Sequence, residues 1–302
     1  MSTELETLAR AQAIGRPSAK NKTKDRGFRF GLLFCVGLSV LLLGVLLVDI
    51  VSDGASRLTW DFVTSFTSIS ADQAGIQAAF WGTIWLMGIC AFFIVPVGVA
   101  TAVYLEEYAD STKWWNRAIE LNIQNLAAVP SIVYGILGLA FLVRGPLDLG
   151  HVVLAGGLTL ALLVLPMVII AGREALRAVP PSIREGSMAL GATQWQTIWR
   201  QVLPAAVPGI ATGVILALSR AIGETAPLIV VGAVAIISFN PEGLDSQFTA
   251  MPILIFEWIS RASNDINDYK PLAAAGILLL MILLLAMNSV AIWLRNRYEQ
   301  KW

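Results

Sequence analysis

The chain has 302 residues, of which 56% are hydrophobic and only 14% are charged. Soluble domains carry roughly 25% charged residues, and a soluble core of this size cannot hide so much apolar surface, so the composition indicates a membrane protein. The formal net charge is zero, which argues against nucleic-acid binding as the main task.

The cysteine and histidine content argues against a metal centre or a Cys/His catalytic centre. Cys35 and Cys90 both fall inside apolar runs, and His151 is the only histidine in the sequence. Neither a CxxC nor an HExxH motif occurs. We therefore expect buried thiols, no disulfide and no metal site.

The first 27 residues are mostly polar and carry a basic cluster next to the first apolar run, formed by Lys20, Lys22, Lys24 and Arg26. The apolar run is longer than the roughly 7–15 residues of a signal-peptide core, so we do not expect a secretory signal. Residues 1–27 are predicted to form a loose basic cytoplasmic tail, and residues 28–302 are predicted to form the transmembrane domain.

Six apolar runs reach the length of about 20 residues that a membrane-spanning helix needs. They are Phe28–Val51, Ile76–Tyr104, Leu121–Val143, His151–Ala171, Ala205–Ile237 and Pro271–Leu294. The second and fifth exceed the thickness of a bilayer, so we expect them to tilt or to project from it. The predicted fold class is an all-α membrane protein with six transmembrane helices.

The lysines and arginines set the orientation of these helices. With both termini in the cytoplasm, 16 of the 21 basic residues lie inside. The outer loops hold four, Arg57, Arg144, Arg261 and Lys270, and Arg220 lies within the fifth run. The opposite orientation would place most of the positive charge outside, so both termini are predicted to be cytoplasmic.

The connection between the fourth and fifth runs, residues 173–210, has the pattern of two short helices. Two pairs fit a capping box, Ser182 with Glu185 and Thr193 with Gln196. Gly191 lies between them and suits the left-handed residue that ends a helix. We expect a hairpin hinged at Gly191, with the second helix ending near Val202 and Pro204 opening the fifth span. Taken alone, the hairpin is equally consistent with simple packing.

This loop resembles the EAA loop of ABC-importer permeases, whose pattern is E-A-A, three residues, G, nine residues, I-x-L-P. Four positions match that pattern: Glu185, Gly191, Leu203 and Pro204. Gly186 and Ser187 replace the two alanines, and Gln201 replaces the isoleucine. The resemblance implies that Glu185, Gly186, Ser187, Gly191, Leu203 and Pro204 couple this chain to a separate ATPase subunit.

The stretch SRAIGETAPL, residues 219–228, places Arg220 and Glu224 within the fifth run. A charge at the bilayer centre costs at least about 2.5–3.5 kcal/mol on insertion scales, and residues four apart share a helix face. Two interpretations stay open: the pair holds the bundle together, or it faces a pathway in which the guanidinium binds an oxyanion. An Arg that precedes its Glu is the weaker pairing order, which favours a further partner for Arg220.

The last predicted outer loop, residues 238–270, contains an apolar stretch, Met251–Ile259, that is too short to span a bilayer. It is consistent either with an interfacial or re-entrant helix or with a loop helix packed on the bundle.

Three stretches together resemble the A-type membrane permeases of phosphate ABC importers: AVYLEEYA at 102–109, AAVPSIVYGILGLAF at 127–141 and SRAIGETAPL. The resemblance covers most of 76–294 and implies a type I ABC-importer permease fold in a bacterial cytoplasmic membrane. It further implies a homologous second permease, two ATPase subunits that bind ATP and Mg, and an extracytoplasmic phosphate-binding protein. Arg220 and Glu224 would then line the substrate pathway, and the chain itself would carry no cofactor and no catalytic residue.

Three alternatives remain open from the sequence. The permease could serve another oxyanion, such as sulfate or molybdate. A stand-alone carrier or channel would use Arg220 and Glu224 to relay protons, although the EAA-like loop argues against it. A structural membrane scaffold is favoured only if no ATPase subunit binds. A phosphate-binding GxxxxGK[ST] loop is absent from the sequence, as expected for a subunit that relies on a partner for hydrolysis.

Overall fold

The computed structural model describes residues 19–68, 70–110, 112–261 and 268–298. All regular elements within these residues are helices. The chain divides into two units, residues 1–52 and 53–302, and each is considered by itself. The predicted boundary between a tail at 1–27 and a domain at 28–302 stays a prediction.

The first unit consists of most of α2 (Ala19–Gly54), which presents apolar side chains on all sides, as expected of a lipid-spanning helix. Residues 19–27 of the predicted tail are helical, and residues 1–18 lie outside the described residues. No proline interrupts this segment, and Lys and Arg are good helix formers. Cys35 is exposed on α2, contrary to the expectation of a buried thiol, because an all-apolar helix buries no particular face.

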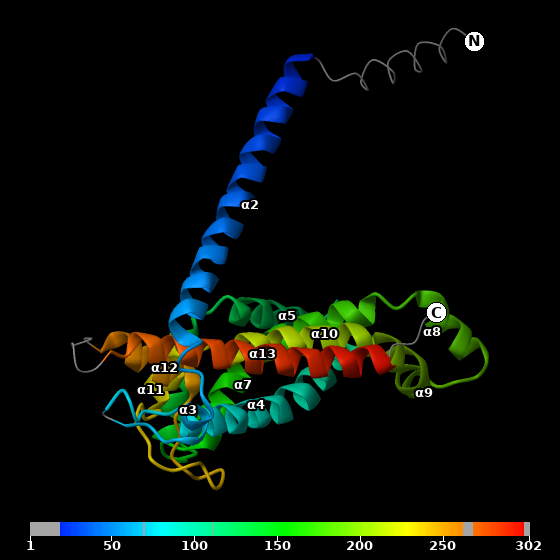
Figure 1. Cartoon of the computed structure of the whole chain (residues 1–302). Helices are drawn as coiled ribbons and strands as arrows, with labels where there is room; N and C mark the ends of the chain where they lie inside the picture. Colours follow the sequence, from blue (N-terminus) through cyan, green and yellow to red (C-terminus); the bar gives the residue numbers. More distant parts are fainter. Residues whose placement is uncertain (1–18, 69, 111, 262–267, 299–302) are drawn as a thin grey trace. The chain divides into compact units, whose positions relative to one another are not determined.

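The described residues of the second unit contain four long continuous helical stretches, Gln77–Tyr108, Val153–Arg177, Gln194–Ala221 and Lys270–Arg297, and a series of shorter helices. Figure 1 shows their arrangement. In chain order the elements are α3 (Trp60–Thr64), α4 (Gln77–Val103) continuing into the π-helix η1 (Tyr104–Tyr108), α5 (Trp114–Ala127), α6 (Ser131–Gly138) continuing into η2 (Leu139–Val143), α7 (Val153–Arg177), α8 (Pro181–Ala189), α9 (Gln194–Thr197) continuing through η3 (Ile198–Val202) into α10 (Leu203–Ala221), α11 (Ala226–Val231), α12 (Met251–Ser260) and α13 (Lys270–Tyr298).

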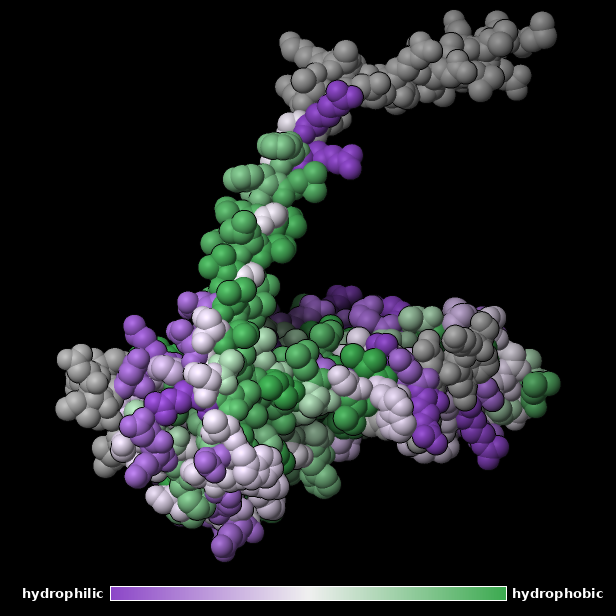
Figure 2. Space-filling view, viewed as in Figure 1, coloured by the Kyte–Doolittle hydropathy of each residue, from purple (hydrophilic) through white to green (hydrophobic). Residues whose placement is uncertain are grey.

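Helix α7 is the centre of this unit and packs against both α4 and α10. Leu160 and Val164 of α7 share one buried cluster with Cys90 of α4 and Ala217 of α10. The buried Cys90 agrees with the prediction for that thiol. Figure 2 shows an apolar band across the middle of the unit, with polar side chains gathered at its two ends. A band of this kind is the surface that contacts the lipid tails of a bilayer.

The two ends of the second unit carry different elements. Helices α8 and α9 lie at one end, and α3, α11 and α12 lie at the other (Figure 1). An ion pair of 2.7 Å joins Glu107, after α4, to Arg184, in α8. The two loops predicted to be cytoplasmic therefore do lie at the same end, which we call the inner end.

The third predicted span, Leu121–Val143, is not one continuous helix. It consists of α5 and α6–η2, which meet at an angle of 106°. Pro130 precedes α6 and disfavours helical geometry in the residue before it, so the helix breaks there. Glu120 pairs with Arg173 near the inner end of α7, whereas Leu142 packs with Ala155 near its outer end. The two helices together therefore run from the inner end of the unit to its outer end, and we count them as one broken span.

The fifth predicted span, Ala205–Ile237, is also wrong as a continuous helix. Helix α10 ends at Ala221, and the short α11 ends at Gly232, whose φ is +94°. The second, fourth and sixth predicted spans are confirmed as α4, α7 and α13, which are long and apolar enough to cross a membrane. With the broken pair counted once, the described residues contain six candidate spans.

The short apolar stretch in the last outer loop forms α12, as expected from its length. Met251, Leu254 and Trp258 are buried, and they pack with Leu272 of α13. A membrane-surface helix would leave such a face to lipid. The structure thus favours the interpretation of α12 as a loop helix packed on the bundle.

Candidate functional site

Arg220 and Glu224 lie beside a helix break at the middle depth of the bundle. Arg220 belongs to the last turn of α10, and its Nε donates to Glu224 Oε1 at 3.2 Å. Arg220 Nη1 also approaches Met167 Sδ at 3.4 Å, and Met167 lies near the middle of α7. The prediction that Arg220 lies close to the middle of the membrane is consistent with this contact. It is the continuity of the helix through Arg220 that is wrong.

The break has identifiable causes in the sequence. Gly223 N–H donates to the carbonyl of Arg220, and Glu224 N–H donates to the carbonyl of Ala221, each at 3.2 Å. These bonds reach back three residues instead of four, so the α-helical pattern of hydrogen bonds ends here. Pro227 is the second residue of α11, and a proline is tolerated in the first turn of a helix but not in its interior. Arg220 therefore sits at a helix C-terminus, where a cation is favoured.

The Arg220 side chain remains accessible although it is paired. Its side chain is 39% exposed and that of Glu224 is 17% exposed. Glu224 provides the one ion pair that the described residues give Arg220. A guanidinium that is paired with a single carboxylate keeps some of its N–H donors available, so this group is suited to bind a second anion.

The segment opposite the break is the second resembling motif, residues 127–141. Gly135 of α6 lies directly on α11, since a Cβ built at this glycine would be 2.7 Å from Pro227 Cα. Tyr134 Oη donates to the carbonyl of Leu126 at 2.8 Å, which ties α6 back to α5. Two broken helices, α5–α6 and α10–α11, thus meet through a backbone contact that only glycine permits.

His151 holds the outer end of α11, a role that the sequence did not indicate. Its ring Nδ1 is 2.6 Å from the carbonyl of Val231, which accepts the ring proton. Gly232 follows with a left-handed φ of +94°, and a side chain there would collide with the His151 ring. Placing these residues together requires the fold, because they are 80 positions apart in sequence.

The hairpin predicted between the fourth and fifth spans is formed by α8 and α9, with one correction to the prediction. Thr193 Oγ1 accepts from Gln196 N–H at 3.3 Å and Gln196 Oε1 accepts from Thr193 N–H at 3.0 Å, so this capping box is confirmed. Gly191 is left-handed with φ +87°, also as predicted. The box at Ser182 is wrong, because α8 starts at Pro181, so Ser182 is already inside the helix.

The predicted coupling residues do not all lie on the surface. Glu185, Gly186 and Gly191 are exposed. The Ser187 hydroxyl instead bonds Thr197 Oγ1 at 2.9 Å, which joins the two arms of the hairpin. Leu203 and Pro204 are partly buried within a helix that runs unbroken from Gln194 to Ala221.

Pro204 lies in the first turn of α10, as predicted for the entry to the fifth span, although η3 joins α10 to α9 without a break. The π-helix η3 precedes Pro204, and wider turns of this kind absorb irregularities in a helix. Sequence analysis also missed Leu190, which is 91% exposed at the tip of the hairpin. Beside it, a cavity of about 420 Å³ opens between α8 and η3, bordered by Ile183, Leu190 and Arg200. An exposed leucine next to an open groove is a surface suited to a protein partner.

A network of ion pairs at the inner end was not predicted either. Glu106 is 3.0 Å from Arg177 and 3.4 Å from Arg173 of α7, and Arg173 is 2.8 Å from Glu120 of α5. The Glu106 and Arg173 side chains are only 16% and 15% exposed. The motif AVYLEEYA contains Glu106, but its partner Arg177 lies 71 residues away in the chain.

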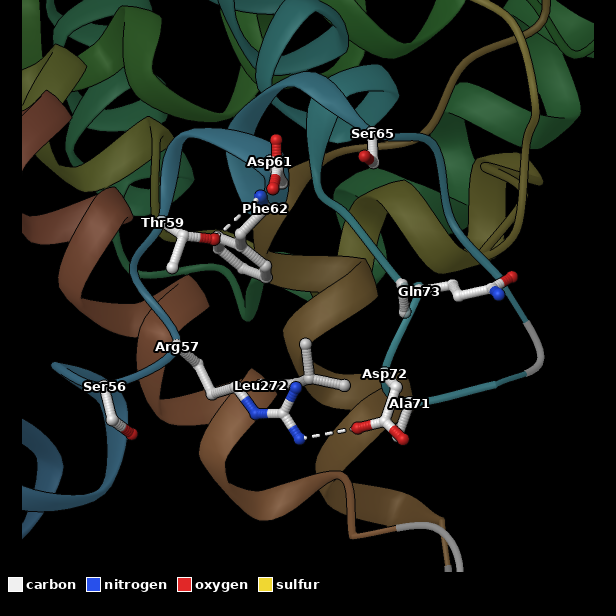
Figure 3. Close-up of a pocket in the computed structure, with 11 residues that line it drawn as sticks. Ser56, Arg57, Thr59, Asp61, Phe62, Ser65, Ala71, Asp72, Gln73 and Leu272 are labelled. Atoms are coloured by element: carbon white, nitrogen blue, oxygen red, sulfur yellow. Dashed lines mark hydrogen bonds and ion pairs between the residues drawn. The ribbon is translucent and has the colours of Figure 1, made fainter.

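A polar pocket of about 450 Å³ lies beside α3 at the outer end. Figure 3 shows the residues that line it. Arg57 Nη2 donates to Asp72 Oδ1 at 2.8 Å across it, and Asp61 adds a second carboxylate. The described lining therefore has more negative than positive charge and repels an oxyanion. The Arg220 region remains the better candidate for anion binding.

Comparisons with known proteins bear on this geometry. A family model described as the binding-protein-dependent transport system inner membrane component matches residues 94–301. The chain is 30% identical over 281 residues to the probable ABC transporter permease protein YqgI of Bacillus subtilis, covering 90% of this chain and 94% of that protein. It is 31% identical over 245 residues to the phosphate transport system permease protein PstA of Haemophilus influenzae, covering 80% and 83%.

A further relative is the phosphate transport system permease protein PstA 1 of Mycobacterium tuberculosis, 39% identical over 182 residues, which span 60% of this chain and 59% of that protein. Among solved structures, a bacterial alginate ABC transporter chain matches with a TM-score of 0.68 at 17% identity, covering 95% of this chain and 99% of that one. A chain of the MetNI methionine ABC transporter matches with a TM-score of 0.61 at 18% identity, covering 74% and 95%. At such identities the structural likeness concerns the fold alone, which is that of type I ABC-importer permeases.

Proposed function

Since the chain belongs to the family of binding-protein-dependent transport system inner membrane components, we propose that it is the permease subunit of an ATP-driven phosphate importer. It forms half of the translocation pathway and resides in the bacterial cytoplasmic membrane as a multi-pass protein. Relatives named as phosphate permeases support the choice of substrate.

One observation carries this proposal most directly: an accessible arginine stands at a helix break at the middle depth of the bundle. Irregular backbone at that depth is tolerated only where protein covers it or where it lines a water-filled space. Transporters commonly bind their substrates at broken helices near the midplane. Arg220, with 39% of its side chain exposed, supplies the cation that such a site needs for phosphate.

The Arg220–Glu224 pair suits passage rather than tight binding. Guanidinium presents a planar fork of donors that matches the oxygens of phosphate. Glu224, 3.2 Å away, partly neutralises the arginine and repels the anion. Phosphate is therefore attracted into the site but leaves it again when the helices move.

The partners follow from the same proposal. A homologous second permease completes the pathway, and two ATPase subunits, which bind ATP and Mg, dock at the inner end against the hairpin around Leu190. An extracytoplasmic phosphate-binding protein delivers the anion at the outer end. This chain supplies no catalytic residue, and nucleic acid has no part in the process.

The test is the variant Arg220→Gln in the complete transporter, assayed for phosphate uptake. We expect uptake to be abolished while membrane insertion and assembly are retained. A matched control is Arg261→Gln, because Arg261 makes an i,i+4 pair with Glu257 through the same atoms at the same 3.2 Å, but at the end of α12. Normal uptake by correctly inserted Arg220→Gln would contradict the pathway role, and loss of the protein from the membrane would favour a structural role.

A further inference from the structure

Glu107, in the π-helix that ends α4, is nearly buried at the inner end of the bundle. Its side chain is 9% exposed, and its carboxylate accepts three hydrogen bonds from Arg184 of α8. Arg184 Nη2 and Nε reach Glu107 Oε1 at 2.7 and 3.2 Å, and Nε reaches Oε2 at 3.3 Å. A forked arginine–carboxylate contact of this kind fixes orientation as well as distance.

Arg184 also fixes the end of α7. Its Nη1 donates to the carbonyl of Val179 at 2.7 Å, and its Nη2 donates to the carbonyl of Leu176 at 2.8 Å. Carbonyls at the C-terminus of a helix lack the full set of partners within that helix, so the guanidinium supplies a further donor there. One side chain of the hairpin's first arm thus joins the ends of α4 and α7.

The second arm of the hairpin is tied to the same residue. Gln194, the first residue of α9, donates from Nε2 to the backbone carbonyl of Glu107 at 2.7 Å. Gly191 lies between Arg184 and Gln194 in the chain and is the left-handed turn of the hairpin. Both arms are therefore attached to Glu107, one through its carboxylate and the other through its carbonyl.

We propose that Glu107 is the positioning residue that delivers the movement of the coupling hairpin to α4. The chain itself connects the hairpin only to α7 and to α10, which leave it at its two ends. Without Glu107, α4 would be linked to α7 through apolar packing and the ion pairs of Glu106, and the described ion pairs would give it no link to the hairpin. With it, a displacement of the hairpin acts directly on the end of α4. This inference rests on the proposed function, in which an ATPase subunit moves the hairpin.

The adjacent carboxylate provides a matched control. Glu106 carries the same charge in the same helical turn and is similarly buried, with 16% of its side chain exposed. Its partners, however, are Arg173 and Arg177 of α7, and the described contacts give it none in the hairpin. Removing either charge disturbs the inner end, but only the change at Glu107 alters the link to the hairpin.

The experiment compares Glu107→Gln with Glu106→Gln in the complete transporter reconstituted in vesicles, measuring phosphate moved per ATP hydrolysed. For Glu107→Gln we expect continued hydrolysis and a fall of about tenfold in this ratio, as expected when a charge-assisted hydrogen-bond cluster loses its charge. Glu106→Gln should keep the wild-type ratio, and Glu107→Asp, which restores the charge, should recover much of it.

A second variant covers the case in which Glu107→Gln does not assemble. Gln194→Ala removes only the second attachment at an exposed position, and we expect an intermediate loss of phosphate moved per ATP. A wild-type ratio in Glu107→Gln or, where that variant does not assemble, in Gln194→Ala would overturn the role of Glu107 alone. An equal fall in Glu106→Gln would also overturn it. If the wild-type complex hydrolyses ATP but moves no phosphate, the proposed function fails, and this inference fails with it.

Discussion

The contact between α6 and α11 at Gly135 allows a prediction whose size follows from the structure. In Gly135→Ala the new Cβ would lie 2.7 Å from Pro227 Cα and 3.0 Å from both Pro227 O and Val230 Cβ. Carbon atoms prefer separations of about 3.5–4.0 Å, so α11 must retreat by about 1 Å. Two of the three atoms are backbone and cannot rotate away.

Overpacking of this kind costs about 1–3 kcal/mol, and the gain of helix propensity from Gly to Ala offsets about 1 kcal/mol of it. Gly88→Ala is the matched control, because Gly88 lies within α4 and nothing lies within 4 Å of its Cβ position. Gly88→Ala should gain only the propensity. We therefore expect Gly135→Ala to be less stable than Gly88→Ala by about 1–3 kcal/mol.

The assay is thermal unfolding of both purified variants in detergent, together with phosphate uptake in the complete transporter. We expect a lower unfolding midpoint and reduced uptake in Gly135→Ala, since moving α11 displaces the break beside Arg220. Equal midpoints and equal uptake in the two variants would refute the argument that α6 and α11 meet through this glycine.

Three further predictions concern the hairpin and the outer end of α11. Gly191→Pro should release the ATPase or uncouple it, because proline cannot adopt φ +87°; unchanged co-purification and coupling would contradict this. Thr193→Ala should destabilise the hairpin by about 1 kcal/mol and speed amide exchange at Gln196, whereas unchanged exchange would argue against the cap. His151→Ala should speed amide exchange across α11 by removing the bond to the carbonyl of Val231, and an unaltered rate would show that this bond does not hold the helix.

Features determined by a few neighbouring residues were predictable from the sequence. The capping box at Thr193 and the left-handed Gly191 are both confirmed, because their geometry depends on hydrogen bonds and sterics within one turn. The box at Ser182 was misplaced, although its pattern was equally good. The preceding prolines start α8 at Pro181, before Ser182. The sequence pattern alone does not show whether the prolines or the capping box determine where the helix begins.

Helix continuity was less predictable than span number. Hydropathy identified a long apolar run around Arg220. It measures polarity and not backbone preference, so it does not reveal that Gly223 and Pro227 divide the run into two helices. The break is covered by α6, which packs against it at Gly135. That packing depends on the tertiary structure.

The residues that join distant segments could not be predicted from a single sequence. Glu107 meets Arg184, which is 77 residues away, and His151 meets Val231 across 80 residues. Each of these side chains is unremarkable within its own segment. Their roles appear only when the bundle brings the segments together.

The central claim is tested most directly by phosphate uptake into vesicles that contain the complete transporter, with sulfate and molybdate as competitors. Our account predicts ATP-dependent uptake that unlabelled phosphate suppresses and the other two anions do not, and that Arg220→Gln abolishes. Uptake without ATP would instead indicate a stand-alone carrier. Preferential suppression by sulfate or molybdate, or full uptake by Arg220→Gln, would contradict the account.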